Sequence, residues 1–215
     1  MRFTDQVAIV TGAAGNLGRA VCAAFEKEGA AVVRLDIETN LLDQRVVDRA
    51  VKKILEERQR IHILCNIAGG FRMGKPVHET SDEDWNFLFD LNIRTVLHTA
   101  RAVVPHMLGS GGGKIVNVGA YAARNGAAQM GAYVASKAAL MRLTESMALE
   151  LRERKINVNC VLPTILDTPQ NRKDMPKADP KRWVALRDLA QAILFLASDD
   201  ARAIHGAALP VTGLS

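Results

Sequence analysis

A tyrosine and a lysine four residues apart form the most reactive pair in the sequence. Tyr133 and Lys137 end the stretch NVGAYAARNGAAQMGAYVASK, and on a helix this spacing places a phenol and an ammonium on one face. An unperturbed phenol has a pKa of about 10 and is a weak acid at neutral pH, while a nearby cation favours the phenolate. The pair is therefore suited to moving a proton to or from a substrate.

A glycine-rich turn, TGAAGNLG at residues 11–18, is the second candidate site. Glycine lets the backbone approach a pyrophosphate, and a helix that starts there supplies N–H donors and the positive end of its dipole. About twenty residues later, Asp36 ends the next apolar run, where a carboxylate accepts hydrogen bonds from ribose hydroxyls and repels a 2′-phosphate. The pattern predicts NAD(H) and disfavours NADP(H), although Arg34 and Arg19 offer cations nearby. The residues predicted to bind the dinucleotide here are Gly12, Gly15, Asn16, Leu17, Gly18 and Asp36.

Both candidate sites need a scaffold, and the chain alternates short β-branched apolar runs with longer helical patterns. The runs lie at residues 7–10, 31–35, 61–65, 114–118, 156–162 and 207–211; the helical patterns lie near 17–28, 44–59, 82–108, 130–153 and 187–197. This alternation predicts an α/β fold of the Rossmann type, a doubly wound parallel sheet with helices on both faces, in a single domain over residues 1–215. The polar, Pro-rich segment 163–182 fits no element and is expected to be a functional loop.

Composition disfavours several other classes of protein. The 215 residues are 48% apolar and 24% charged, which suits one sizeable core. The net charge of +5 comes from basic residues that alternate with acids, and aromatic residues make up only 5%, so no nucleic-acid site is predicted. Cys22, Cys65 and Cys160 form no C-x-x-C pair, which predicts reduced thiols in a cytoplasmic protein and no metal site. No signal-peptide pattern or membrane-length apolar run is present.

Five motifs together resemble the short-chain dehydrogenase/reductase family along the whole chain. The turn at 11–18 resembles TGxxxGxG with Asn16 as the middle residue, and Asn66-Ile-Ala68-Gly69 resembles NNAG with Ile as the second residue. Asn92, the Tyr133-x-x-x-Lys137 pair and the stretch Pro163–Thr168 complete the set. The resemblance implies an NAD(P)-dependent oxidoreductase. Its implied cofactor contacts, beyond the glycine-rich turn and Asp36, are Asn66, Ala68, Gly69, Tyr133, Lys137, Pro163, Ile165 and Thr168.

The resemblance also implies roles and an assembly. Tyr133 is expected to be the acid/base, Lys137 to bind the nicotinamide ribose and lower the pKa of Tyr133, and Asn92 to hold a water in a proton relay. The helices at 82–108 and 130–153 are expected to build a homotetramer or dimer. Apolar residues beyond one core stripe agree with this, among them Phe87, Phe89, Leu97, Met107 and Met130.

Two features depart from the family pattern. The family's catalytic serine lies about thirteen residues before the tyrosine, where this chain has Ala120; the loss of such a donor typically costs ~10²–10³ in rate. Tyr121, Asn125 and Gln129 are the neighbours that could replace the hydroxyl. The family also places a helix and a strand between the acid at Asp36 and a D-x-x-D-like motif, which Asn40–Asp43 resembles. The three residues 37–39 are too few to build either element. Either the helix and strand are truly deleted, or this sequence lacks residues that the natural protein has. A true deletion would leave an apolar sheet edge exposed, which favours missing residues.

The missing hydroxyl bears on the substrate. Residues 162–183, 63–71 and 118–123 resemble the dihydropteridine reductase group of the family, which uses NADH and also lacks the serine. A quinonoid dihydropterin is already polarised, so hydride can add without one oxygen gathering a full negative charge. Two hypotheses follow. One is an NAD(H)-dependent oxidoreductase acting on a small carbonyl, quinone-like or quinonoid dihydropterin substrate under a loop at 163–182 that closes; the other is a catalytically idle dinucleotide-binding sensor or scaffold.

Overall fold

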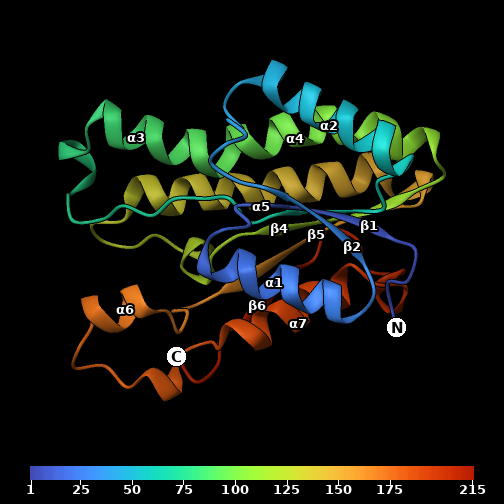
Figure 1. Ribbon diagram of the computed structural model, residues 1–215. Coiled ribbons are helices and arrows are strands. Elements are labelled where there is room, and N and C mark those ends of the chain that lie inside the picture. The colour runs from blue at the N-terminus through green and yellow to red at the C-terminus, as the bar shows by residue number, and fades with distance from the viewer.

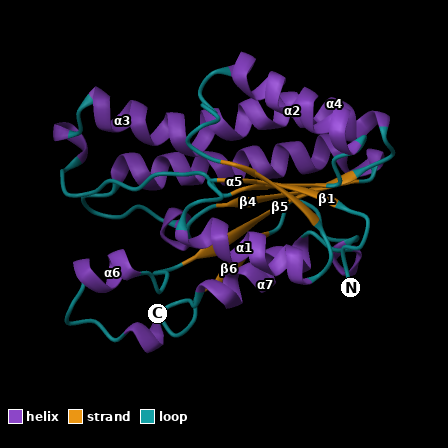
Figure 2. Cartoon of the chain, viewed as in Figure 1, coloured by secondary structure: helices purple, strands orange, loops and turns teal.

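A six-stranded parallel sheet organises the protein, whose computed structural model describes residues 1–215 (Figures 1 and 2). The strands are β1 (Val7–Thr11), β2 (Ala31–Leu35), β3 (Ile63–Asn66), β4 (Gly113–Val118), β5 (Ile156–Pro163) and β6 (Ala208–Val211). Their order in the sheet is β2-β1-β3-β4-β5-β6. Every residue of β1, β3 and β5 is buried, which is the pattern of parallel strands that are covered on both faces.

Helices cover both faces of the sheet. They are α1 (Asn16–Lys27), α2 (Gln44–Arg58), α3 (Asp82–Phe89), α4 (Thr95–Gly109), α5 (Gly131–Leu151), α6 (Pro169–Asp174) and α7 (Leu186–Leu196). In Figure 1, α1 and α7 lie below the sheet, and α2, α4 and α5 lie above it. Two hydrophobic clusters fill these layers, one between the sheet and α1 and α7, the other between the sheet and α2, α4 and α5. The doubly wound fold predicted from the alternation is confirmed, and no helix combines the length and apolarity that a membrane crossing needs.

The helical pattern at 82–108 is interrupted in its middle. Between α3 and α4 the residues Asp90–Arg94 form a π-helical turn. π-turns are rare and frequently occur at functional sites, and this one carries the buried Asn92. Met107, which was expected to lie outside the core, is fully buried against the sheet; it belongs to the α4 core stripe instead.

The segment 163–182 is more ordered than its composition predicted. It contains α6 and a short 3₁₀ turn at Pro180–Arg182, so the expectation that it fits no element was wrong. Both elements begin with Pro in the first turn and are capped by a side chain, Thr168 for α6 and Asp179 for the 3₁₀ turn. A proline is tolerated there because the first N–H groups of a helix have no intrahelical partner. Short capped turns of this kind lack the apolar periodicity that marks a longer helix.

The sheet ends at β2, which pairs only with β1. After β2 the chain turns at Asp36 and reaches α2 at Gln44 without a further strand. Asn40 and Asp43, which resemble an adenine-contacting motif, serve this connection: the Asn40 side chain accepts from the N–H of Leu42, and Asp43 caps α2 by accepting from the N–H of Arg45. The chain therefore passes directly from β2 to α2, without the helix and outer strand that the family has between them.

Candidate active site

The glycine-rich turn joins β1 to α1 and leaves no room for a side chain at Gly12 or Gly18. Gly12 has a φ of +63°, and a Cβ there would lie 2.8 Å from the backbone nitrogen of Ala68. A Cβ at Gly18 would collide with the carbonyl oxygen of Gly12 and the backbone of Ala13. Only glycine allows this close approach of α1 to β1. The N-terminus of α1 has no side-chain cap and no acid in its first turn, so its N–H groups remain available to an anion.

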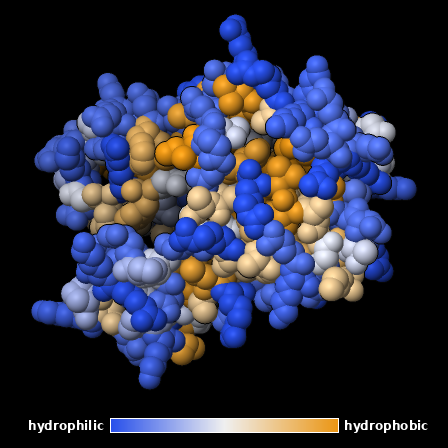
Figure 3. Space-filling view, viewed as in Figure 1, coloured by the Kyte–Doolittle hydropathy of each residue, from blue (hydrophilic) through white to orange (hydrophobic).

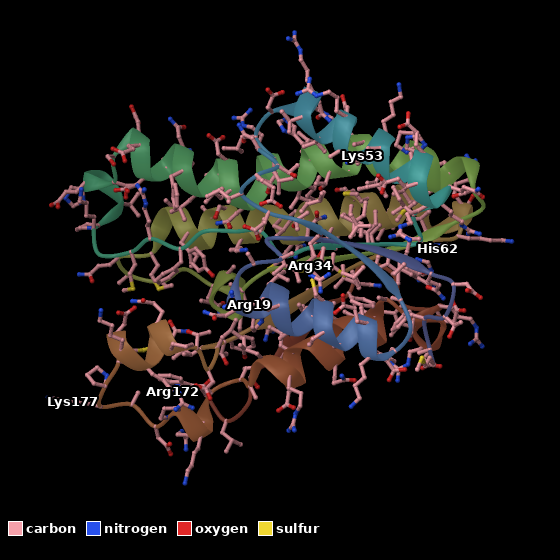
Figure 4. The ribbon with its side chains drawn as sticks, in the orientation of Figure 1. Arg19, Arg34, Lys53, His62, Arg172 and Lys177 are labelled. Carbon is pink, nitrogen blue, oxygen red and sulfur yellow. The ribbon has the colours of Figure 1, made fainter.

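Asp36 is tied to this turn. Its carboxylate accepts from the N–H of Ala14 at 2.5 Å and from the N–H of Ile37 at 2.8 Å. The two arginines near it are engaged elsewhere. Arg34 forms an ion pair with Glu26 of α1 at 2.6 Å, and Arg19 donates to the Ala14 carbonyl and the Asn16 side chain. Figure 4 shows Arg34 beside α1 and Arg19 near the start of that helix.

Thr11, which the sequence patterns did not single out, holds the next part of the site. Its hydroxyl oxygen accepts from the N–H groups of Ile67 and Ala68, at 3.0 and 3.1 Å. This fixes the Asn66–Gly69 turn after β3 against the end of β1. Asn66 itself is buried at the end of β3, and its side-chain amide donates to the side chain of Asn117 on β4, so it links the start of the turn to the neighbouring strand. The signal that could have found Thr11 is its position directly before Gly12.

Asn92 joins the turn after β3 to α5. Its side-chain oxygen accepts from the N–H of Gly70 at 2.9 Å, and its amide nitrogen donates to the Gly70 carbonyl and to the hydroxyl of Ser136. Gly69 lies between Asn92 and α5, since a Cβ there would be 2.9 Å from Asn92 Oδ1 and 3.2 Å from Lys137 Nζ. The structure therefore brings Asn92, Gly69 and Lys137 together.

Tyr133 lies in the first turn of α5 and is half-buried. Its ring meets the ring of Phe71 edge to face, with centroids 4.8 Å apart, and Phe71 is 55% exposed. The phenol oxygen has no hydrogen-bond partner in the chain and is not sealed from solvent. Burial raises the pKa of Tyr133 to about 12. The hydroxyl is free to meet a substrate in its protonated form.

Lys137 is buried, and its ammonium donates to the carbonyl oxygen of Val118 at 2.8 Å. Burial lowers the pKa of Lys137 to about 8, and the nearby thiol of Cys160 acts weakly in the opposite direction. The expectation that Lys137 lowers the pKa of Tyr133 is not met in the chain alone. Burial is the cause of the raised pKa of the phenol, and the Lys137 ammonium is held on Val118.

Ala120 lies where the family has a serine, and its surroundings are apolar. It is buried in a cluster with Ala123, Val134, Met141, Cys160 and Leu162, against which Tyr133 packs. The three candidate replacements, Tyr121, Asn125 and Gln129, are exposed, and none forms a hydrogen bond with Tyr133.

The loop after β5 forms the other wall of the site. Pro163 ends β5, the half-buried Ile165 accepts from the N–H of Val184, and the Thr168 hydroxyl caps α6 by accepting from Asn171. Arg172 holds Asp167 with two hydrogen bonds at 2.6 and 2.8 Å. Figure 3 shows the surface hollowed between the α6 segment and the body of the molecule, and Figure 4 shows Arg172 and Lys177 on the outer side of that segment.

These residues fit a dinucleotide. The glycine cradle of Gly12 and Gly18, the uncapped start of α1 and the carboxylate of Asp36 form one end. Gly69, Tyr133 and Lys137 form the other end, at the carboxyl edge of the parallel strands, where ligands bind in open α/β sheets. Gly15 is the N-cap residue of α1, while Asn16 and Leu17 are its first residues.

Comparisons with known proteins agree with this geometry. The family model for short chain dehydrogenase matches residues 35–179. Cyclopentanol dehydrogenase from Comamonas sp. (strain NCIMB 9872) is 33% identical, covering 99% of this chain and 97% of that protein. The 3-oxoacyl-[acyl-carrier-protein] reductase FabG of Thermotoga maritima is 32% identical, covering 99% and 98%.

A solved structure is also similar. Carveol dehydrogenase from Mycobacterium avium, in complex with NAD, is 27% identical, covers 99% of this chain and 98% of that one, and superposes with a TM-score of 0.90. The alignment with the Comamonas protein extends over 244 positions although this chain has 215 residues, so part of that relative has no counterpart here. With a family match over most of its length and relatives that align end to end, the chain belongs to the short-chain dehydrogenase/reductase family of NAD(P)-dependent oxidoreductases.

Proposed function

We propose that the protein transfers hydride between NAD(H) and a small carbonyl or conjugated substrate, with Tyr133 as the acid/base. One observation carries this proposal: Asn92 and Lys137 meet at Gly69, and Tyr133 lies one helical turn before Lys137 on α5 with its ring against Phe71, at the same edge of the sheet as the open phosphate turn. A bound nicotinamide supplies or accepts the hydride. The side chains then position the substrate and move the proton.

The roles of the residues follow from their contacts. Tyr133 Oη has no partner in the chain and can donate its proton to a substrate oxygen or nitrogen. Lys137 is held on Val118 O, from where it can hydrogen-bond a ribose hydroxyl beside Gly69. The turn after β3 and the start of α5 are both fixed by Asn92, through Gly70 and Ser136. We place Asn66, Ala68, Pro163, Ile165 and Thr168 along the cofactor, in agreement with their positions at the carboxyl ends of β3 and β5.

NAD(H) is preferred over NADP(H) in this proposal. Asp36 lies beside the phosphate turn, where a 2′-phosphate would meet a carboxylate. Arg34, the nearest cation that could offset this repulsion, is committed to Glu26. Arg19 is committed to the turn itself through Ala14 and Asn16. The M. avium carveol dehydrogenase with NAD bound is consistent with this preference.

The substrate is proposed to be planar and conjugated, with a quinone or quinonoid dihydropterin as the leading class. Ala120 lies in an apolar cluster that contains no serine or threonine, so the site lacks the second hydroxyl that would help Tyr133 to stabilise a full oxyanion. Phe71 presents an exposed ring beside Tyr133, which offers a stacking surface. The relatives named above are named for an alcohol or an acyl-carrier-protein substrate, so the dihydropterin rests on the resemblance of residues 162–183, 63–71 and 118–123.

The experiment is NADH oxidation by the purified protein with quinonoid dihydropterin, quinones and simple ketones. Wild type is compared with Ala120→Ser and Tyr133→Phe. Turnover of a conjugated acceptor by wild type, little gain in Ala120→Ser and a large loss in Tyr133→Phe are expected. A wild type inert on every acceptor, with ketone reduction appearing in Ala120→Ser, contradicts the proposal and favours an idle dinucleotide-binding protein.

Assembly and location are proposed on separate grounds. Phe87, Phe89, Leu97 and Met130 are only half-buried, which supports a homotetramer or dimer built on α3, α4 and α5. Cys22, Cys65 and Cys160 are free and buried, which supports a cytoplasmic setting. Sedimentation analysis of the purified protein tests the assembly.

A further inference from the structure

The connection from β3 to α3 passes beside the start of α5 (Figure 1). Its main chain is fixed at two points. Gly70 exchanges two hydrogen bonds with the side chain of Asn92, and Gly74 donates its N–H to the carbonyl oxygen of Gln129 at 2.9 Å. The three residues between these points, 71–73, depend on their side chains for any further anchor.

Arg72 provides that anchor on α3. Its guanidinium donates to the carboxylate of Asp84 at 2.6 Å, lies 3.5 Å from the carboxylate of Glu83 and stands 3.8 Å from the centroid of the Phe87 ring. A planar guanidinium can pair with a carboxylate and lie over an aromatic ring at the same time. No other side chain of residues 71–75 forms a hydrogen bond or an ion pair with α3.

The space beside Arg72 is otherwise open. A pocket of about 200 Å³ lies between residues 72–75, α3 and the start of α5, and its lining includes Met73, Leu88 and Met130. Close packing is what normally keeps a segment in place, and an unfilled pocket withholds it on this side. Without the guanidinium the connection therefore has room to shift toward α3.

Phe71 is the side chain that such a shift would displace. Its ring meets the ring of Tyr133 edge to face, at 4.8 Å between centroids and an interplanar angle of 86°, yet it is 55% exposed. One aromatic contact is modest in strength, so the place of this ring depends on the backbone that carries it.

We propose that Arg72 is a positioning residue for the reaction. By fixing the connection to α3 it holds the Phe71 ring beside Tyr133, as the wall on which a flat substrate lies. This inference rests on the proposed function, in which Tyr133 exchanges the proton with a planar, conjugated substrate. It adds a determinant of substrate binding that lies outside the motifs of the family.

The proposal predicts a particular kinetic effect. A stacking contact holds the bound substrate and the transition state alike, so its loss raises KM and leaves kcat unchanged. Arg72→Ala is expected to raise the KM for a planar acceptor by about threefold to tenfold, and to change kcat and the KM for NADH by less than about twofold. A merely structural role gives the opposite pattern, because a smaller active fraction lowers the apparent kcat at constant KM.

A double-mutant cycle tests whether Arg72 acts through Phe71. Phe71→Ala should raise the same KM at least as much, and Arg72→Ala should add little in that background. Arg72→Lys keeps a cation for Asp84 and loses the flat contact with the ring, so its KM should lie between those of wild type and Arg72→Ala. Arg142→Ala is the matched control, because it breaks an ion pair of 2.7 Å with Glu145 elsewhere on α5.

A second readout needs no turnover. The chain has two tyrosines, so a Tyr121→Phe background leaves Tyr133 as the only phenol. Burial raises the pKa of Tyr133 to about 12. Phe71→Ala and Arg72→Ala should each lower the pH at which phenolate absorption appears, measured by stopped-flow pH jumps before the chain unfolds. Removal of the Arg72 charge alone acts in the other direction, so a fall reports the loss of the ring.

The outcomes separate the proposal from the function on which it rests. A wild-type KM for the acceptor in Arg72→Ala, a lowered kcat at constant KM, or a phenol titration that Arg72→Ala leaves unmoved overturns the role of Arg72. A wild type inert on every acceptor is a failure of the proposed function, and the phenol titration then decides by itself whether Arg72 holds Phe71 against Tyr133.

Discussion

Gly69→Ala probes the point where Asn92 and Lys137 meet. The new Cβ would lie 2.9 Å from Asn92 Oδ1 and 3.2 Å from Lys137 Nζ, where an ordinary contact begins at 3.4 Å. The Asn92 amide must therefore shift by about 0.5 Å, which weakens its bonds to Gly70 and Ser136. With about 1 kcal/mol net for each buried hydrogen bond, one or two of them amount to about 1–2 kcal/mol of stability. For a chain of this size that is about 2–8 °C in Tm.

The effect on rate is expected to exceed the effect on stability. A displacement of about 1 Å in a catalytic group can cost about 10²-fold, so kcat should fall by about tenfold to a hundredfold. Steady-state NADH oxidation and thermal unfolding measure the two quantities. Gly126→Ala is the matched control, because a Cβ there meets nothing within 4 Å. A Gly69→Ala variant with wild-type kcat and Tm would refute the convergence of Asn92 and Lys137 around this glycine.

Three further outcomes are expected. Tyr133→Phe should lose about 10²–10⁴ in kcat with an unchanged Tm, because the phenol oxygen has no partner in the chain; a retained rate would remove Tyr133 as the acid. Asp36→Ala should raise the KM for NADH by about tenfold or more and reduce the preference for NADH over NADPH. Arg34→Ala should leave that preference unchanged, since the Arg34 guanidinium of the wild type is already paired with Glu26. His62 accepts the N–H of Val7 on Nδ1, and burial lowers its pKa, so the unfolded chain binds the proton more readily. The contribution of neutral His62 to the free energy of unfolding should be complete above about pH 6.5 and should be lost as the pH falls below that value. The Tm of wild type and of His62→Gln is therefore measured between pH 8 and pH 5. A Tm that falls equally steeply in both proteins would contradict this role of His62.

The sheet and the long helices were predictable because their signals are local and strong. Buried parallel strands such as β1 and β5 are continuous apolar runs, and α5 carries one apolar stripe at helical spacing. The π-helical turn at Asp90–Arg94 escaped prediction because a single residue of extra register leaves the apolar pattern intact. α6 escaped for the opposite reason: it is six residues long, polar throughout, and fixed by one Thr168 cap and the Asp167–Arg172 contact.

The site was predictable as a set of positions but not as a set of interactions. The spacing of Tyr133 and Lys137 placed both on α5, yet it could not show that the ammonium turns to Val118 and leaves the phenol to desolvation. That choice depends on where β4 ends relative to α5, a tertiary relation with no sequence signature. Ser136 was missed because a hydroxyl that supports a turn looks like any other in a sequence, and Thr11 was considered only as part of the glycine-rich turn.

The absence of the outer strand unit from this chain and the presence of the phosphate turn are compatible for a structural reason. Asp36, the residue after which the family's extra helix and strand would follow, is anchored from inside the fold, by the N–H of Ala14 in the phosphate turn. Nothing beyond residue 37 holds that carboxylate. The unit is therefore removable without disturbing the turn that receives the pyrophosphate. What its absence changes is the edge of the sheet, which ends at β2.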